Sequence, residues 1–306
     1  MVRVIYRAFD VLNIAVQGPL SKMTQPRLFC FGLGYSARRL ALGLIDAGWQ
    51  VAGTAREDVS VEELKAHCIE AHVFDRSRPL KDTQAMLKEA THLLSSVPPD
   101  AQGDAVLDLH GEDIAACSKS LKWIGYLSTT GVYGNRDGGM VKEGDVLHPT
   151  SQRAKDRAAA ESRWLELGAH AFRLAGIYGP TRNVLEDVRA GRAKRIDKPG
   201  HMFSRIHVDD IALVVRASMA RPDPGAIYNV CDDEPAPPMD VVTFACDLLG
   251  VEPPPVQSYD NVEMSAMART FWADNKRVDN TRIKEELGVD LRYPGYRQGL
   301  QAIFDA

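Results

Sequence analysis

A glycine-rich turn near residue 32 is the clearest chemical feature of the sequence. Residues 29–37 read as a short apolar strand, then Gly-x-Gly-x-x-Ala, then the start of a helix. Gly32 permits a tight turn, Gly34 lets the backbone approach a phosphate, and the small Ala37 lets the helix pack on the strand. A helix N-terminus offers N–H groups and a positive dipole end to an anion. We therefore predict a pyrophosphate site formed by Gly32, Gly34, Tyr35, Ser36 and Ala37.

The end of the second predicted strand bears on the choice between NAD and NADP. An NAD site usually places a carboxylate at this tip, about 20 residues after the glycines. Here Thr54 and Arg56 stand at the tip instead. A hydroxyl and a guanidinium suit a 2′-phosphate, so we predict NADP rather than NAD. The alternative is that Arg56 is a solvated loop charge.

Further cofactor contacts are expected where the next strands end. Asp75 follows the strand at 71–74 and is placed to meet the adenine ring. Ser95, Ser96 and Val97 end the strand at 92–97, where a dinucleotide would cross the sheet. Each of these residues could equally be a turn residue.

Strands and helices alternate between residues 27 and 174. The predicted strands are 27–31, 50–54, 71–74, 92–97, 123–128 and 170–174, and the predicted helices are 36–47, 61–67, 84–89, 104–118 and 153–165. This alternation is typical of βαβ units and a parallel sheet covered on both faces. Right-handed crossovers then give an α/β fold with a Rossmann-type doubly wound sheet.

After Tyr178 the alternation loosens. Helices are predicted at 209–220, 239–249, 280–287 and 296–304, with one further strand at 227–230. We divide the chain into an N-terminal tail (1–26), a dinucleotide-binding core (27–180) and a small C-terminal α/β cap for substrate (181–306), parts of which return to the core. We expect translation to start at Met23, which leaves 22 residues as a tail; the rival is a docking helix from Val4 to Val16.

Composition excludes several classes of protein. The chain has 306 residues, 25% of them charged, and a formal net charge of −4. These values indicate a globular protein without the basic bias of a nucleic-acid platform. No apolar stretch approaches the roughly 18 residues of a membrane span. The five cysteines are scattered without zinc spacing, so we expect no metal site and a cytoplasmic location, as a monomer or homodimer.

A series of blocks in the right order resembles the extended short-chain dehydrogenase/reductases, the NAD-dependent epimerase/dehydratase superfamily. The blocks are GLGYSA, YLSTTGVYG, FRLAGIYGP, RIHVDDIA and IYNVCDDEP, followed by RIKEELG and YPGYRQGL. Together they cover about residues 27 to 303. The resemblance implies a nicotinamide dinucleotide cofactor and acid–base chemistry at a carbinol or carbonyl.

The same resemblance implies a Ser or Thr after the fifth strand and a Tyr-x-x-x-Lys pair on the next helix. Thr129, with Thr130 beside it, falls at the Ser/Thr position. The superfamily usually carries an acid four residues after the Lys. Anchoring on Glu161 therefore places Arg153 at the Tyr position and Arg157 at the Lys position. A guanidinium stays protonated and cannot exchange a proton as a phenol does.

A second register pairs Ser151 with Lys155 but misplaces Glu161 by two residues. Neither register contains a tyrosine, so the chain resembles an atypical member that has lost the usual pair. Tyr133 could supply a phenol near the nicotinamide or could pack its loop, and Tyr178 is expected to pack. Arg157 is expected to bind an anion of the cofactor or substrate.

The cap blocks suggest the remaining contacts. Gly179 and Pro180 should back the nicotinamide, and Arg205 should contact the substrate, as the resemblance implies. His207 and Asp210 are expected to join the core to the cap. The basic run of Arg192, Lys194 and Arg195 could steer an anionic substrate or could be a solvated face.

Two functions remain at this point. The first is an NADP-binding oxidoreductase or sugar-nucleotide epimerase-like enzyme of the atypical kind, in which Thr129 polarises the substrate oxygen. The second is a non-catalytic protein that senses NADP(H). Intact cleft blocks favour the enzyme, and the missing Tyr and Lys favour the sensor.

Overall fold

Strand β1 (Arg27–Phe31) is apolar on both faces, which places it inside a sheet covered on both sides. Leu28 and Cys30 pack into one hydrophobic cluster, and Phe29 and Phe31 pack into another on the opposite face. This alternation is the two-residue period of a strand. The computed structural model describes residues 25–306, so the predictions about Met23 and the N-terminal tail lie outside the described residues.

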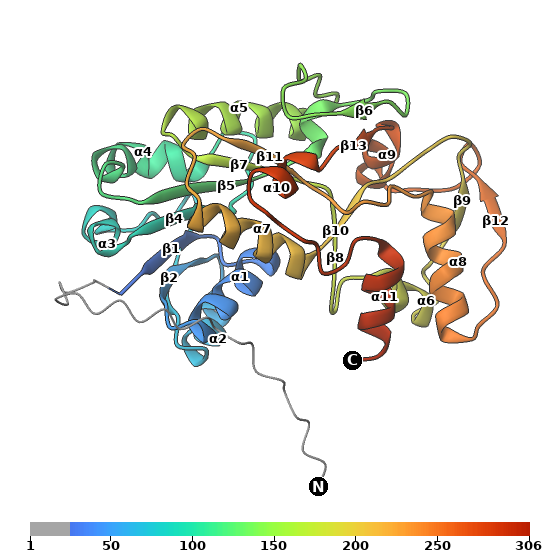
Figure 1. Cartoon of the computed structure of the whole chain (residues 1–306), viewed down its shortest axis with the longest axis horizontal. Coiled ribbons are helices and arrows are strands. Elements are labelled where there is room, and N and C mark those ends of the chain that lie inside the picture. The colour runs from blue at the N-terminus through green and yellow to red at the C-terminus, as the bar shows by residue number, and fades with distance from the viewer. Residues whose placement is uncertain (1–24) are drawn as a thin grey trace, which may run out of the picture.

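Seven parallel strands form the central sheet, in the order β11-β7-β5-β4-β1-β2-β3 (Figure 1). They are β1, β2 (Gln50–Ala55), β3 (Glu70–Val73), β4 (His92–Ser95), β5 (Trp123–Thr129), β7 (His170–Leu174) and β11 (Ile227–Val230). Every pairing between them is parallel. The predicted Rossmann-type α/β fold is therefore confirmed.

Helices cover both faces of this sheet. The cluster beneath β1 residues Leu28 and Cys30 includes side chains of α1 (Tyr35–Asp46), α2 (Asp58–Ala66) and α7 (Val208–Ala220). The opposite cluster includes side chains of α3 (Thr83–Glu89), α4 (Ala105–Cys117) and α5 (Gln152–Glu166). α7 and β11 come from the C-terminal part of the sequence, so that part contributes to the core.

A smaller layer extends from the carboxyl ends of the strands (Figure 1). It contains α6 (Val184–Arg189), α8 (Pro238–Leu249), α9 (Ala266–Ala273), α11 (Tyr296–Phe304) and two strand pairs, β8 (Gly176–Tyr178) with β10 (Arg205–His207) and β9 (Arg195–Asp197) with β12 (Val256–Ser258). A third apolar cluster holds α6, α8 and α11 together. The short helix α10 (Thr281–Glu285) packs beside β11.

One more parallel pair joins distant segments. β6 (Met140–Val141) follows the 3-10 turn η1 (Thr130–Tyr133), and it pairs with β13 (Arg277–Val278). The sequence did not predict this pair, the strand pairs of the cap, or helices α6 and α9. Their strands have only two or three residues, too short for a periodic pattern.

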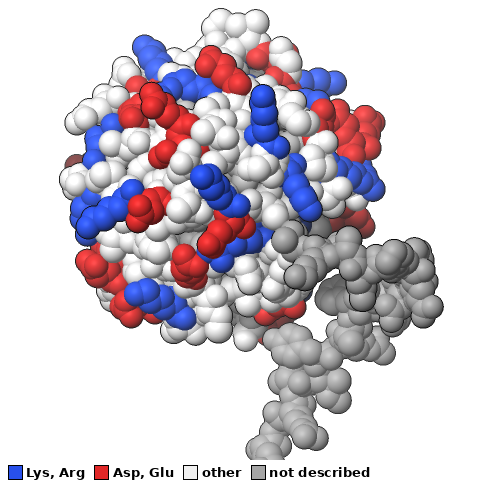
Figure 2. Space-filling model, turned by 90° about the vertical axis from the view of Figure 1, so that its left-hand side faces the viewer, with Lys and Arg blue, Asp and Glu red and all other residues white. Residues whose placement is uncertain are grey.

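The surface mixes charges of both signs. On the face drawn in Figure 2, basic and acidic side chains are interspersed rather than gathered into one patch. Within residues 25–306, no helix has both the length and the apolar character needed to cross a bilayer.

Gly53 tests the close packing of β2 against β1. A Cβ atom at Gly53 would lie 2.3 Å from the Cys30 carbonyl oxygen. We expect Gly53→Ala to lower the free energy of unfolding by about 1–3 kcal/mol, the usual cost of overpacking a core. Gly111, inside α4, is the matched control because a Cβ there meets nothing within 4 Å. Gly111→Ala should stabilise by about 0.5–1 kcal/mol. Equal urea midpoints for the two variants would contradict this reading.

Candidate functional site

Side chains from β2 and from the end of β4 hold the glycine turn between β1 and α1 in place. Gly32 has φ +82°, a conformation that favours glycine. Its N–H donates to Thr54 Oγ1 at 2.9 Å, and its carbonyl accepts from Ser96 Oγ. A Cβ on Gly32 would lie 2.9 Å from a methyl carbon of Val97. The predicted residues Thr54, Ser96 and Val97 therefore fix the shape of the turn.

This position corrects the role predicted for Thr54. The residue is only 1% exposed, and its hydroxyl oxygen accepts the Gly32 N–H. It lies beneath the turn because the end of β2 is covered on both faces. Thr54 thus supports the glycine turn and does not reach the surface where a 2′-phosphate would lie.

The N-terminus of α1 is open to an anion. A Cβ at Gly34 would meet nothing within 4 Å, no side chain caps the helix, and its first turn contains no acidic residue. Ala37 is buried against the sheet, as predicted for the packing position. The Tyr35 hydroxyl donates to the Pro180 carbonyl at 2.7 Å, which ties the turn to the Gly179–Pro180 segment. The cradle fits a pyrophosphate.

Arg56, at the end of β2, is exposed, and no residue in the described part of the chain pairs with its guanidinium. Its carbonyl accepts from Arg78, whose side chain also reaches Asp58 at 3.7 Å and Asp75 at 2.5 Å. A second guanidinium therefore lies beside the tip of β2. The same Arg78 guanidinium lies close to the carboxylate of Asp58, the acidic residue that follows the tip of β2.

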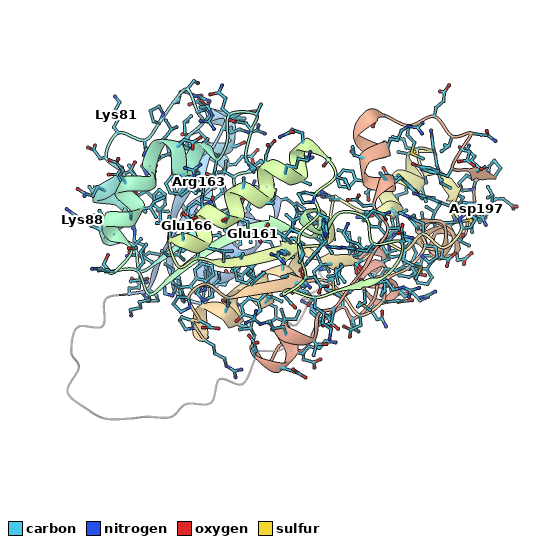
Figure 3. All side chains as sticks on the ribbon, turned by 90° about the horizontal axis from the view of Figure 1, so that it is seen from above. Lys81, Lys88, Glu161, Arg163, Glu166 and Asp197 are labelled. Carbon is cyan, nitrogen blue, oxygen red and sulfur yellow. The ribbon has the colours of Figure 1, made fainter. Side chains whose placement is uncertain are left out.

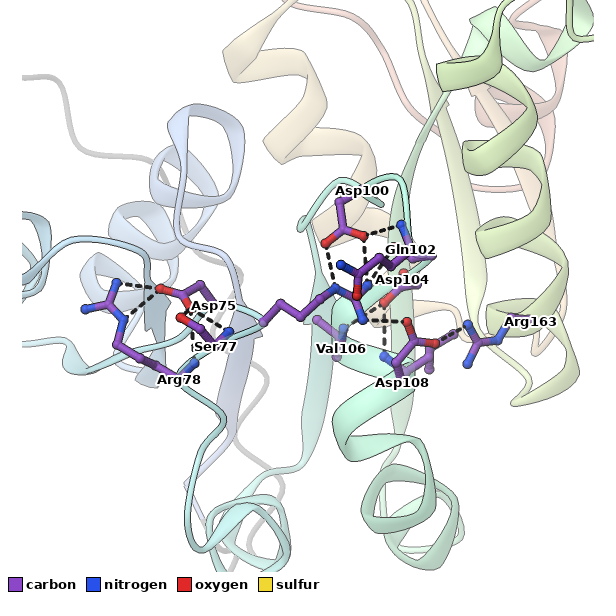
Figure 4. A network of polar contacts seen from close by, with 12 residues as sticks. Asp75, Ser77, Arg78, Asp100, Gln102, Asp104, Val106, Asp108 and Arg163 are labelled. Carbon is purple, nitrogen blue, oxygen red and sulfur yellow. Dashed lines mark hydrogen bonds and ion pairs between the residues drawn. The ribbon is translucent and has the colours of Figure 1, made fainter.

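Asp75 closes the turn after β3. Its Oδ1 accepts from the Ser77 hydroxyl at 2.6 Å and from the Ser77 N–H at 2.8 Å (Figure 4). These bonds, together with Arg78, lower the pKa of Asp75 to about 2. The Asp75 carboxylate is thus already occupied by hydrogen bonds and an ion pair within its own turn. Ser95, the other predicted contact near this edge, is fully buried, and its Oγ has no partner among residues 25–306.

At the end of β5, Thr129 caps the turn η1. Its Oγ1 accepts from the Gly131 N–H at 3.1 Å, and the side chain is half-buried. The next helix, α5, begins after Ser151, whose Oγ accepts from Ala154 N–H at 3.2 Å. Ser151 is therefore the N-cap of α5. Lys155, its partner in the second register, is exposed.

The two arginines of the first register differ in position. Arg153 is exposed and Arg157 is half-buried. Arg157 Nη1 donates to the Leu127 carbonyl at 2.8 Å, and its guanidinium lies 5.8 Å from the centre of the Tyr126 ring. If Arg157 binds an anion as expected, it must do so with a guanidinium that already donates to the backbone of β5. Arg153 points to solvent, away from a position where it could contact the sheet.

A buried ion pair lies beneath this edge. Glu161 on α5 and Arg173 on β7 are 2.6 Å apart, with 2% and 3% of their side chains exposed. The Ser128 hydroxyl donates to Glu161 at 2.5 Å. Figure 3 labels Glu161 on α5, together with Arg163 and Glu166 of the same helix. Glu161, the anchor of the sequence register, thus has a structural partner.

Tyr133 belongs to the same network. Its hydroxyl donates to Asn229 Oδ1 at 2.7 Å and accepts from Arg173 at 2.8 Å. Burial raises the pKa of Tyr133 to about 12. The hydroxyl is fully enclosed, so the structure favours the packing role over a catalytic one. Tyr178 is also buried, and its hydroxyl lies 3.4 Å from the Gly295 carbonyl.

In the cap, Arg205 lies at a cavity where a substrate could bind, whereas His207 has a structural role. Arg205 donates to the Phe203 and Ala236 carbonyls and lines a cavity of about 80 Å³ with Tyr178 and Tyr296. His207 instead caps α7 by accepting the Asp209 N–H, and burial lowers the pKa of His207 to about 4.

Asp210 accepts from the Arg292 and Tyr293 N–H groups, which joins α7 to the C-terminal segment. The three side chains of the predicted basic run all have partners. These are Asp187 for Arg192, the Glu263 carbonyl for Lys194 and the Pro254 carbonyl for Arg195.

A segment from the C-terminal part of the chain reaches the start of α5, although no motif in the sequence indicates it. Asp274 accepts from the Thr150 hydroxyl at 2.9 Å, and Lys276 lies 3.5 Å from Asp274. No motif marks Asp274, because its partner Thr150 lies 124 positions away in the sequence. Among the residues described, no group of three or more His, Cys, Asp or Glu side chains is arranged to hold a metal ion.

Known proteins resemble this chain in sequence and in structure. No protein-family model matches the chain. The chain is 28% identical to protein YeeZ of Escherichia coli K12 over 280 residues, 86% of this chain and 94% of YeeZ. A solved Silicibacter pomeroyi protein of unknown function is 48% identical, with a TM-score of 0.85, over 92% of this chain and 99% of that one.

Enzymes of known activity share the fold at much lower identity. The dTDP-glucose 4,6-dehydratase of Bacillus anthracis, solved with NAD, has a TM-score of 0.70 at 15% identity, over 92% of this chain and 96% of that one. Sugar-nucleotide epimerases from two other bacteria share the fold as well. The fold expected from the sequence resemblance is therefore confirmed.

The buried pair gives a stability test. Glu161→Gln should leave the Arg173 charge unpaired in the core and cost about 3–5 kcal/mol of unfolding free energy. Replacing both residues, Glu161→Leu with Arg173→Met, should restore much of that loss. The exposed pair Arg189–Glu186 is the control, since breaking it should cost no more than about 1 kcal/mol. Similar losses for the buried and exposed pairs in chemical denaturation would refute the assignment.

Proposed function

The chain belongs to the same protein family as the Silicibacter pomeroyi protein, and on this fold we propose that it binds a nicotinamide dinucleotide and catalyses hydride transfer at a carbinol or carbonyl carbon. The observation that carries the proposal is the open glycine cradle, where Gly32 and Gly34 meet an uncapped α1 without acidic residues. Such a cradle suits a pyrophosphate. The bound cofactor would supply the hydride acceptor or donor.

For the same site we propose NADP as the preferred cofactor. The tip of β2 carries the exposed Arg56, with Arg78 donating to its carbonyl. The acid that follows, Asp58, is faced by Arg78 at 3.7 Å. A guanidinium without a protein partner is suited to a 2′-phosphate. The NAD bound in the Bacillus anthracis dehydratase makes NAD the competing choice.

We further propose that the substrate is anionic and that Arg205 contacts it. Its guanidinium is half-buried beside the small cavity with Tyr178 and Tyr296. The Tyr296 hydroxyl is buried and has no partner within the described residues. A carboxylate or phosphate could accept from both groups. Thr129 at the end of β5 would polarise the substrate oxygen.

A non-catalytic NADP(H) sensor is the second candidate, because α5 contains no tyrosine and Arg153 is exposed. The two functions separate by experiment. Purified protein would be freed of nucleotide and then incubated with NADPH and a panel of carbonyl compounds. Oxidation of NADPH that depends on a carbonyl supports the enzyme. Tight NADPH binding with no oxidation across the panel supports the sensor.

The cofactor assignment predicts the effect of Arg56→Ala. We expect NADPH binding to weaken by about 1.5–3 kcal/mol, the contribution of a hydrogen bond to a charged group, with NADH binding unchanged. Calorimetric titration of both cofactors measures this difference. Arg189→Ala removes an exposed arginine of the cap and serves as the control. An equal loss for the two cofactors, or a wild type that prefers NADH, would remove the 2′-phosphate assignment.

A further inference from the structure

A cavity of about 350 Å³ lies where the chain after β11 meets α10 and the strand pair of β6 and β13. Its volume is in the range of small-molecule sites. Three of its lining residues are acids, namely Asp232 and Asp233 after β11 and Asp279 after β13. The cavity shares no lining residue with the smaller one at Arg205. A ligand here would therefore be additional to the cofactor and substrate proposed above.

Asp232 carries the buried polar atom of this cavity that has no partner. The residue is 1% exposed, and its Oδ2 is buried without a hydrogen bond to any residue in the range 25–306. Its N–H donates to the Arg205 carbonyl at 2.7 Å, and its Oδ1 accepts from the Glu234 N–H at 3.4 Å. Backbone contacts thus hold the residue and leave one carboxyl oxygen over. Such an atom requires an explanation, and a hydrogen-bond donor bound in the cavity would supply one.

The donor side chains that line the cavity are already used by Asp233. The Lys284 Nζ donates to Asp233 Oδ1 at 2.6 Å. The Asn280 Nδ2 donates to the same oxygen at 2.6 Å and to a backbone carbonyl. Within the described residues, no ion pair joins Asp232 or Asp279 to a basic side chain. The lining therefore offers acceptors and negative charge that its own donors do not satisfy.

This imbalance selects the chemistry of the ligand. An ammonium group has three donors and no acceptor, and its charge compensates a carboxylate. In the described part of the chain, no three acids, cysteines or histidines are arranged to hold a metal ion, so an organic cation fits better. The side chains of Met140, Pro235 and Val278 add apolar surface to the same cavity, and Met140 is 55% exposed.

We propose that this cavity binds a primary alkylammonium ion. The ammonium group donates to Asp232 Oδ2 and to the carboxylate of Asp279. The hydrocarbon part of the ligand lies against Met140, Pro235 and Val278, which removes apolar surface from water.

The protonation of Asp232 is coupled to such a ligand. Burial raises the pKa of Asp232 to about 8, with Arg205 on β10 opposing that shift and Glu234 adding to it. Burial also raises the pKa of Tyr178 on β8 and of Cys231, so both neighbours stay neutral. Asp232 is therefore mostly protonated at pH 7, and an entering cation favours its ionised form. The remaining charged groups of the cavity are Asp233, Asp279 and Lys284.

Calorimetric titration of the full chain with three small probes tests the site. We expect n-butylammonium to bind. The n-butyltrimethylammonium ion has the same charge and chain but no N–H, so it should bind at least about tenfold more weakly, the loss of a hydrogen bond to a charged group. The n-butyrate anion should not bind. Equal affinity for the two cations, or tighter binding of n-butyrate, would overturn the proposal.

Substitutions in the cavity should change this affinity in opposite directions. Asp232→Asn and Asp279→Asn should each weaken n-butylammonium binding by about 10- to 100-fold. Lys284→Met should tighten it about two- to fivefold, the scale of an exposed ion pair, because Asp233 loses its cation. Asp46→Asn, at the exposed end of α1, is the control and should have no effect. Unchanged binding to Asp232→Asn would refute the assignment.

The pH dependence of binding tests Asp232 without relying on a substitution. A proton and the ligand compete for Asp232, so affinity should rise about tenfold between pH 6 and pH 7 and level off above about pH 8. The probe stays charged over this range, since alkylamines titrate near the lysine pKa of about 10.4. Titrations at pH 6 in buffers of different ionisation enthalpy should show release of about one proton per ligand. Binding without proton release, or with no pH dependence, would exclude Asp232 as the contact. These titrations need neither cofactor nor turnover, so their outcome does not depend on the nicotinamide function.

Discussion

The ion pair between Glu161 and Arg173 is the interaction on which the candidate catalytic edge depends. With their side chains almost fully buried, neither charge can be solvated, so each requires the other. Ser128 on β5 donates to Glu161, and Tyr133 on η1 accepts from Arg173. The pair therefore fixes the relative positions of β5, α5, β7 and η1. Thr129, the residue that follows Ser128, takes its place from this network.

The glycine turn between β1 and α1 depends on backbone geometry rather than charge. Gly32 adopts a conformation that other residues rarely adopt, and Thr54 and Ser96 bind its N–H and carbonyl. Hydroxyl groups serve here because each can donate or accept within a confined space. The Tyr35 hydroxyl then connects the turn to Pro180. Hydrogen bonds thus fix the glycine turn, and a buried ion pair fixes the edge formed by β5 and α5, as the alignment of a cofactor with a substrate requires.

Much of the fold follows from periodicity, and much of the site does not. All seven strands of the central sheet were predicted near their observed positions, because buried parallel strands leave clear apolar runs between turn residues. The glycine turn was also placed correctly, because Gly32 adopts a φ of +82° that favours glycine; the phosphate approach predicted at Gly34 stays a prediction. Thr54 was placed wrongly: its position at the end of β2 was correct, but the sequence does not show that the turn folds back over it. The role of Glu161 as a partner of Arg173 depends on a contact between helix and sheet that no local pattern encodes.

Lys276 is another residue whose position depends on tertiary contacts and could not be predicted from the sequence. Its segment reaches α5 only because β13 pairs with β6 and because Asn275 binds loops from the core and from the cap. Only 10% of the Lys276 side chain is exposed, and its Nζ lies 3.5 Å from Asp274. Burial lowers the pKa of Lys276, and the charge of Asp274 opposes that shift. The environment of this amine is therefore set by contacts between segments far apart in the chain, which no local pattern in the sequence encodes.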